Sequence, residues 1–381
     1  MDHIYLDYNA TTPIDPQVAE AMLPYIHEQY GNPSSTHVPG VAAKQAVDNA
    51  RRQLAEMLGA KEDEVIFTSG GTESNNHAIK GVFGAYREKG NHIITSSVEH
   101  PAVLEVCRYL EEQGGRVTYL SVDEFGMVDA QHVADAITPE TILVSIMHAN
   151  NEVGTINPVA KIGEICRERG VPFHCDAVQA VGRISLDLAK LPIDLLSLTA
   201  HKLYGPMGVG ALCIRGGEKR VPIEPLFDGG GHERRMRSGT LPVPLIVGFG
   251  KACELAAECM RDESIRIEQL RNRLWCGLRE AVVGVSVNGH PRRRLAGNLN
   301  VSFDNVDGDA LMMSLRDIAV SSGSACTSAD PQPSHVLRAM GVSDTLTRAS
   351  LRFGLGRFTT PDDVEFAITY VTDAIGRLRG L

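Results

Sequence analysis

The fold is indicated best by residues 193–206, which read Ile193-Asp194-Leu195-Leu196-Ser197-Leu198-Thr199-Ala200-His201-Lys202-Leu203-Tyr204-Gly205-Pro206. An apolar run of this length predicts a buried strand, and the glycine and proline behind it predict a tight turn. Lys202 follows the strand directly, at the end where α/β sheets hold their ligands. Burial there can lower the pKa of an amine enough to make it a nucleophile, although a surface lysine in a loop would have the same position in the sequence.

Similar apolar runs alternate with longer amphipathic stretches through the first two thirds of the chain, which is typical of parallel strands joined by helices. The predicted helices include Pro16–Tyr30, with Asp15 as N-cap, and Val159–Arg169. The predicted strands are Glu64–Thr68, His92–Thr95, Arg116–Leu120, Ile142–Ile146, Pro172–Cys175, Ile193–Leu198 and Val209–Ile214. We therefore expect an α/β fold with a mainly parallel seven-stranded sheet.

A second, smaller α+β domain is predicted from the last third of the sequence. A long helix is expected from about Thr240 to Val282, followed by strands near Leu299–Phe303 and Leu351–Phe353. The segment Ile4–Leu6 is expected to join them. These patterns predict a large domain over residues 15–250 and a small domain formed by residues 1–14 and 251–381, with the active cleft between the two.

Composition narrows the class of protein. The chain has 381 residues, of which 43% are hydrophobic and 22% are charged, so it is expected to fold as a globular protein and not to be disordered. A net charge of −10 argues against nucleic acid and anionic membranes as partners. The absence of a signal-like start or a membrane-spanning stretch predicts a cytoplasmic protein, and the eight cysteines, none in a C-x-x-C pair, are expected to be reduced. No metal site is predicted.

Two further predicted strands end in residues that could bind a ligand. Phe67-Thr68-Ser69-Gly70-Gly71-Thr72-Glu73-Ser74-Asn75-Asn76 predicts a strand, two glycines and a helix start, which offers free backbone N–H groups to a phosphate. Asp176 ends another apolar strand, where it could pair with a protonated pyridine nitrogen. Each pattern has an ordinary alternative: the two glycines could form a plain connection between a strand and a helix, and Asp176 could be a helix N-cap. Together with Lys202 they are the anchors that a pyridoxal phosphate site requires.

Cys326 differs from the other cysteines. It lies in Ser321-Ser322-Gly323-Ser324-Ala325-Cys326-Thr327-Ser328, a small and polar run without periodicity that continues to about residue 333. A mobile loop would allow its thiol to move between a cleft and an outside acceptor. The remaining cysteines occur in helix-like or strand-like patterns and are expected to fill the core; they are Cys107, Cys166, Cys175, Cys213, Cys253, Cys259 and Cys276.

The sequence resembles the pyridoxal-phosphate-dependent cysteine desulfurases of the iron–sulfur-assembly group, which belong to the class V aminotransferase-like family. The resemblance extends to about Thr360. Besides the stretches around Gly71, Lys202 and Cys326, it rests on Tyr5-Leu6-Asp7-Tyr8-Asn9-Ala10-Thr11-Thr12-Pro13, Gly31-Asn32-Pro33-Ser34-Ser35, Val98-Glu99-His100, Asn150-Asn151-Glu152-Val153-Gly154, Gly229-Gly230-Gly231-His232-Glu233-Arg234, Arg237-Ser238-Gly239-Thr240 and Leu351-Arg352-Phe353.

The resemblance implies a homodimer of fold type I with pyridoxal 5'-phosphate as cofactor. It implies that Lys202 forms the Schiff base, that Asp176 pairs with the ring nitrogen and that His100 stacks on the ring and helps to move protons. Gln179 is implied to contact the phenolate oxygen of the cofactor. The residues implied to hold the phosphate are Gly71, Thr72, Thr199 and His201, with Thr240 contributed by the partner subunit. Asn151 and Arg352 are implied to hold the substrate carboxylate, for which a bidentate arginine is suited.

The implied reaction converts L-cysteine to L-alanine. The thiolate of Cys326 attacks the substrate sulfur, and the resulting persulfide passes to a sulfur-acceptor protein such as an iron–sulfur scaffold. Selenocysteine lyases share a stretch similar to Ser96-Ser97-Val98-Glu99-His100 and are the alternative. A non-catalytic partner protein would be expected to lack Lys202 or Cys326, and both are present.

Overall fold

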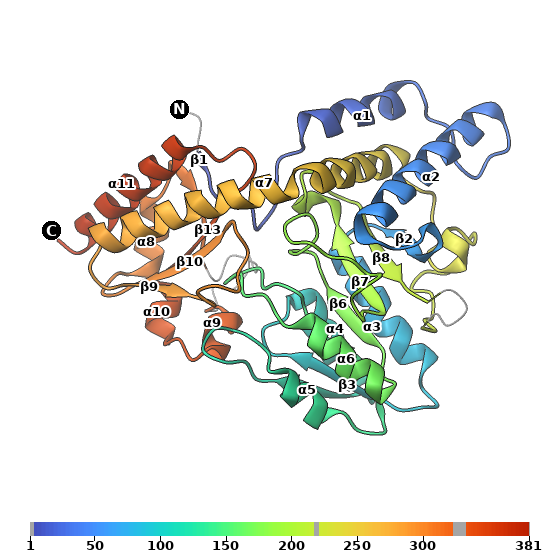
Figure 1. The fold of residues 1–381 in the computed structure, drawn as a ribbon, viewed down its shortest axis with the longest axis horizontal. Coiled ribbons are helices and arrows are strands. Elements are labelled where there is room, and N and C mark those ends of the chain that lie inside the picture. The colour runs from blue at the N-terminus through green and yellow to red at the C-terminus, as the bar shows by residue number, and fades with distance from the viewer. Residues whose placement is uncertain (1–3, 217–220, 323–332, 381) are drawn as a thin grey trace.

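The computed structural model describes residues 4–216, 221–322 and 333–380, which form two lobes joined along one long helix (Figure 1). The helices are α1 Pro16–His27, α2 Val38–Leu58, α3 Gly71–Ala85, α4 Pro101–Glu112, α5 Ala130–Ala136, α6 Val159–Arg169, α7 Val243–Ala281, α8 Gly308–Ser314, α9 His335–Ala339, α10 Asp344–Arg348 and α11 Pro361–Leu378. The strands are β1 Ile4–Tyr5, β2 Val65–Thr68, β3 His92–Ser96, β4 Arg116–Leu120, β5 Thr141–Ser145, β6 Phe173–Asp176, β7 Leu195–Thr199, β8 Gly210–Ile214, β9 Val285–Asn288, β10 Asn298–Phe303, β11 Ile318–Ala319, β12 Ser321–Ser322 and β13 Ser350–Gly354.

The larger lobe is built on the seven-stranded sheet that the sequence predicts. Its strand order is β2-β8-β7-β6-β5-β3-β4, and β8 alone runs antiparallel to its neighbours. Successive residues of one strand enter different hydrophobic clusters: Ile93 lies in one and Ile94 in the other. Both faces of the sheet are therefore covered, which explains why the strands are near-continuous apolar runs.

The smaller lobe has a four-stranded antiparallel sheet of order β12-β13-β10-β9. The predicted strands near Leu299 and Leu351 are its central pair, β10 and β13. The N-terminal strand β1 pairs with β11, and Leu6 packs in the hydrophobic cluster of this lobe. The first residues and the last third of the chain therefore lie side by side, on the left of Figure 1.

Helix α7 connects the two lobes. Its N-terminal half, to Ala256, packs in the core of the larger lobe, and its C-terminal half, from Ile267, packs in the core of the smaller one. The two lobes therefore share this helix, and the change from one hydrophobic core to the other falls between Ala256 and Ile267.

Two sequence expectations need correction. Helix α1 begins at Pro16 with Asp15 as N-cap, as predicted, but it ends at His27 and not at Tyr30, ahead of the glycine and proline at positions 31 and 33. Among the seven described cysteines, which are all free thiols, Cys259 and Cys276 are exposed, so they do not fill the core. Both lie on α7, whose outer face remains open to solvent. Within the described residues, none of the helices is long and apolar enough to cross a membrane.

A buried ion pair fastens helix α2 to the edge of the large sheet. The guanidinium of Arg51 donates to both carboxylate oxygens of Glu233, at 2.6 and 2.9 Å, and to the carbonyl of Val65 at 2.7 Å. Glu233 also accepts from the backbone N–H of Phe67 at 2.8 Å. The ion pair thereby holds a segment in which Glu233, Arg234 and Arg235 adopt left-handed φ angles of 46°, 56° and 67°, a conformation disfavoured for these residue types.

We predict that Glu233→Gln lowers the free energy of unfolding by about 3 kcal/mol, because it leaves a buried guanidinium without its counter-charge. Urea unfolding of the apoprotein at one protein concentration measures the change. The matched control is Glu105→Gln, which removes an exposed ion pair with Arg108 and should cost less than about 1 kcal/mol. Equal effects of the two substitutions would contradict the role given to Glu233.

Candidate functional site

A cavity of about 310 Å³ opens at the C-terminal ends of the strands of the large sheet. Its walls come from both lobes and from the N-terminal segment. The lining residues are Asn9, Ala10, Gly71, Thr72, Asn75, His100, Met147, Ala149, Asn151, Asp176, Val178, Gln179, Thr199, His201, Lys202 and Arg352. All site residues expected from the sequence are among them except Thr240 and Cys326. Thr240 is exposed and lies outside this lining, and Cys326 lies outside the described residues.

The cavity receives the N-terminus of helix α3, which begins at Gly71 directly after β2 and a short turn. A Cβ atom at Gly71 would lie 2.6 Å from Cγ2 of Val178, so glycine is required for this close approach. The first backbone N–H groups of a helix have no partner within the helix and carry the positive end of its dipole. With the hydroxyl-bearing Thr72 and Thr199 beside them, they form a site suited to a phosphate.

Asp176 ends strand β6 and is 6% exposed. One carboxylate oxygen accepts from the side-chain amide of Asn75 at 2.7 Å, and the other accepts from the backbone N–H of Val178 at 3.0 Å. No cation lies within ion-pair distance of Asp176 among the residues that the structure describes. A buried carboxylate of this kind can accept a cationic group from a ligand.

Lys202 ends a single 3₁₀ turn that follows strand β7. Its ammonium group donates to the backbone carbonyls of Asn9 and Ala10, at 2.6 and 2.5 Å. His201 precedes it, and burial together with the charge of Lys202 lowers the pKa of His201 to about 4. The lysine therefore lies in the cavity beside a histidine that is neutral at pH 7.

Arg352 brings a positive charge into the cavity from the smaller lobe, on strand β13. It donates to the carboxylate of Asp7 at 2.8 Å, to the hydroxyl of Ser321 at 3.0 Å and to the carbonyl of Asn151 at 3.1 Å. Its side chain is 5% exposed, and Nε is buried without a partner. These contacts hold the guanidinium at the cavity wall, where it can bind an anionic ligand group.

Gln179 and Asn9 face each other at the base of the cavity. The amide nitrogen of Gln179 donates to the carbonyl of Asn9 at 2.9 Å, and the side-chain amide of Asn9 donates to Oε1 of Gln179 at 3.3 Å. Asn9 Oδ1 and Asn75 Oδ1 are both buried and have no hydrogen-bond partner in the structure. Sequence reasoning assigned no role to either asparagine, although both lie within the motifs Tyr5–Pro13 and Phe67–Asn76 that it singled out.

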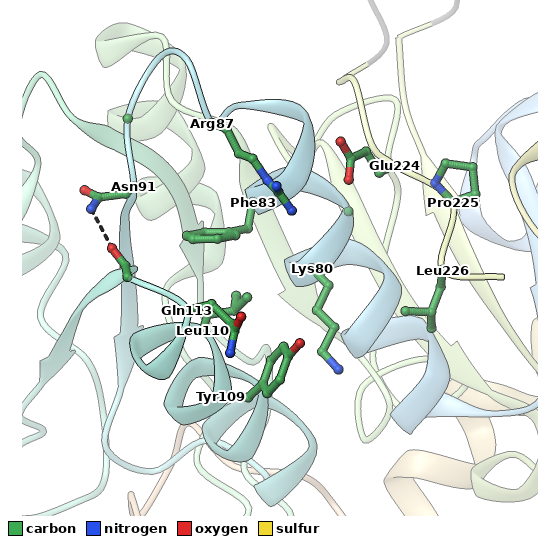
Figure 2. Close-up of a pocket in the computed structure, with 13 residues that line it drawn as sticks. Lys80, Phe83, Arg87, Asn91, Tyr109, Leu110, Gln113, Glu224, Pro225 and Leu226 are labelled. Carbon is green, nitrogen blue, oxygen red and sulfur yellow. Dashed lines mark hydrogen bonds between the residues drawn. The ribbon is translucent and has the colours of Figure 1, made fainter. Parts of the chain in front are cut away.

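A second cavity, of about 410 Å³, lies on the surface between helices α3 and α4 and the segment Glu224–Leu226 (Figure 2). Its features include Lys80, whose ammonium is 4.5 Å from the ring centroid of Tyr109, and a hydrogen bond from Asn91 to the carbonyl of Gly114. None of the site residues expected from the sequence lines it. The first cavity is therefore the candidate active site.

Known proteins resemble this chain over nearly its whole length. The model of the family Aminotransferase class-V matches residues 4–366. The cysteine desulfurase IscS of Photorhabdus laumondii is 53% identical over 99% of this chain and 94% of its own length, and that of Proteus mirabilis is 52% identical over the same shares.

Solved structures show the same likeness. A NifS-like protein matches with a TM-score of 0.92 and 38% identity over 99% of this chain and 100% of its own. A structure described as SspA in complex with cysteine matches with a TM-score of 0.83 and 39% identity, over 94% of this chain and 100% of its own. The chain thus belongs to the class V aminotransferase family and, within it, to the pyridoxal-phosphate-dependent cysteine desulfurases.

Proposed function

We propose that this protein converts L-cysteine to L-alanine and transfers the sulfur to Cys326 as a persulfide. The observation that carries the proposal is the single cavity in which Lys202, Asp176, the start of helix α3 and Arg352 meet. The relatives named cysteine desulfurase, at 52–53% identity over nearly the whole chain, support the same reaction.

The residues of the cavity fit pyridoxal phosphate. Asp176 is a buried carboxylate without a cationic partner among the described residues, which suits the protonated ring nitrogen. The N-terminus of α3 with Thr72, together with Thr199 beside it and His201, would hold the phosphate. Lys202 would hold the aldehyde carbon, and Gln179 would contact the phenolate oxygen. When bound, the cofactor supplies an electron sink for the carbanion that forms when the substrate loses its α-proton.

The protein residues bind and orient the amino acid. Arg352 would bind the substrate carboxylate with Asn151 beside it, since Asp7, Ser321 and the Asn151 carbonyl fix the guanidinium in place. Lys202, once its amine is released, is placed to take the α-proton. After the bond between Cβ and sulfur has broken, one proton added at Cβ and one returned at Cα complete alanine. In this proposal Arg352 and Asn151 bind the substrate carboxylate, and Lys202 transfers the α-proton.

Sulfur transfer would use Cys326. Its thiolate attacks the γ-sulfur of the substrate, so that the S–S bond forms as the bond between Cβ and sulfur breaks, and the electron pair of that bond remains with the substrate. Ser321 contacts Arg352 at 3.0 Å and lies five residues before Cys326 in the sequence. Five residues can span up to about 18 Å, a length that would allow a thiol at position 326 to reach the cavity.

We further propose that the persulfide passes to an acceptor protein and supplies sulfur for iron–sulfur clusters or other thio-cofactors, in the cytoplasm. The likeness to the IscS proteins supports this role. A homodimer is proposed as the active form. Its support is a set of exposed apolar side chains in this part of the chain: Leu23 and Ile26 on α1, Tyr30 in the connection after it and Val38 at the start of α2, the last two each 83% exposed.

We predict that Lys202→Ala abolishes the covalent link that borohydride reduction forms between protein and cofactor, because its amine is the one that lies in the cavity. Peptide mapping after reduction locates the modified residue. Lys80→Ala, which alters the second cavity, serves as the control and should leave the link intact. Recovery of the cofactor on another lysine of the wild-type protein would refute the assignment.

Cys326→Ser should release no alanine from L-cysteine and still bind it, seen as a change in the cofactor spectrum. Cysteine sulfur leaves carbon poorly without a nucleophile, whereas selenium leaves more readily, so the variant should keep part of any activity on selenocysteine. Cys259→Ser, at an exposed position of α7, is the matched control. Desulfuration by Cys326→Ser at the wild-type rate would exclude the persulfide route. A wild-type protein active on selenocysteine and inactive on cysteine would favour a selenocysteine lyase.

Thr240 lies outside the cavity of its own chain and is proposed to hold the phosphate in the partner subunit. We predict that Thr240→Ala weakens cofactor binding by about 10- to 100-fold, the usual loss for one hydrogen bond to a charged group. Hybrid dimers of a Lys202→Ala subunit and a Thr240→Ala subunit provide the test. If Thr240 acts across the dimer, half of the hybrid's sites regain wild-type cofactor affinity and turnover. If it acts within its own chain, every site in the hybrid carries a defect.

A further inference from the structure

His100 combines two positions, since it lines the candidate active site and is also the N-cap of helix α4. Its ring atom Nδ1 accepts a hydrogen bond from the backbone N–H of Ala102 at 3.1 Å. The next two N–H groups of the helix, those of Val103 and Leu104, bond to the carbonyl of His100 at 2.8 and 3.2 Å. The imidazole therefore replaces the side-chain oxygen that usually caps a helix.

This capping bond determines which ring nitrogen carries the proton. A nitrogen that accepts a hydrogen bond has no proton, so the neutral ring of His100 must carry its proton on Nε2. In the imidazolium form Nδ1–H and the N–H of Ala102 would be two donors facing each other at the same 3.1 Å. The positive end of the helix dipole also disfavours a positive charge at this position.

Most of the influences on His100 lower its pKa. Burial lowers the pKa of His100 most strongly, and the positive charge of Lys202 and the nearby His335 lower it further. Asp176 is the opposing group, because its carboxylate favours the charged ring. The sum is a lowered pKa and hence a neutral imidazole at pH 7.

The turn that carries His100 is held in place from two sides. The buried carboxyl group of Glu99 accepts from the hydroxyl of Ser96 at 2.7 Å and from the backbone N–H of Met147 at 2.9 Å. Nε2 of His335, at the start of α9, donates to the carbonyl of Glu99 at 2.9 Å. These contacts hold the backbone beside the cap, so that the ring can keep its bond to Ala102 during the reaction.

We propose that His100 acts in this site as a neutral hydrogen-bond donor through Nε2–H and does not carry protons, in contrast to the proton-moving role that the family resemblance implies. The inference rests on the proposed function and deepens it. A neutral imidazole could give up its proton only by becoming an anion, and its one lone pair is already engaged by Ala102. The Nε2–H group instead stabilises negative charge on the bound amino acid, and proton transfer falls to Lys202.

The ring nitrogens can be observed directly by NMR of protein labelled with ¹⁵N at histidine, without cofactor and with it. The spectrum of His100→Asn identifies the signals. We expect Nδ1 without a proton and Nε2 with one, unchanged from about pH 8 to about pH 6. A proton on Nδ1 within this range would overturn the proposal. A wild-type protein with the expected spectrum but no desulfurase activity would instead refute the proposed function.

Two substitutions distinguish the capping role of His100 from its role as a hydrogen-bond donor. Asparagine at position 100 keeps a capping oxygen near the place of Nδ1 but has no donor at the place of Nε2, whereas glutamine reaches the place of Nε2 with its amide and caps poorly. His100→Asn should keep the unfolding temperature of the wild type and lose about 100-fold in turnover, the usual cost of removing one preorganised donor. His100→Gln should unfold at a lower temperature and retain more turnover than His100→Asn.

The dependence of kcat on pH supplies the remaining control. If His100 does not carry protons, His100→Gln should show the same ionisations as the wild type, at a reduced rate. Loss of one limb of the pH profile in His100→Gln would show that the wild-type histidine titrates during the reaction and would overturn the proposal.

Discussion

The carboxylate of Asp176 is the constraint around which the site is organised. It is buried at the end of β6, and its two protein hydrogen bonds, from Asn75 and Val178, leave its charge without a cationic partner among the described residues. A buried charge of this kind costs free energy unless a ligand compensates it. The bond to Asn75 also joins the strand end to the N-terminal part of α3. Asp176, which would pair with the ring nitrogen of the cofactor, and the start of α3, which would hold the cofactor phosphate, are therefore fixed relative to each other.

The substrate side of the cavity depends on contacts between segments that are far apart in the sequence. Arg352 lies on a strand of the smaller sheet and contacts Asp7 near the N-terminus, Asn151 of the larger lobe and Ser321. These partners account for much of its hydrogen-bonding capacity and hold the guanidinium rigidly. A preorganised positive charge orients a carboxylate at a smaller entropic cost than a flexible one would. Strand β1 pairs with β11, and this pairing brings Asp7 of the N-terminal segment next to Arg352.

The environment of the cavity keeps its histidines neutral. His201 is buried beside Lys202, and His100 caps α4 with one of its ring nitrogens. Neutral rings leave Lys202 and Arg352 as the positive charges of the lining, and Asp176 as the negative one. Binding of an amino acid and transfer of its α-proton can then be assigned to different residues.

The sequence by itself determined the local features of this protein. Long apolar runs ending in Lys202 and Asp176 predicted buried parallel strands, because a strand covered on both faces needs apolar residues throughout, and the Gly70-Gly71 turn predicted the helix start. The tertiary structure decided which side chains share a contact. Asn9 and Asn75 lie within the motifs Tyr5–Pro13 and Phe67–Asn76, but their identity alone does not show that their side chains face the cavity, since an asparagine at such positions can equally face solvent. The proton position on His100 likewise depends on the distance to one backbone N–H, which no residue pattern encodes.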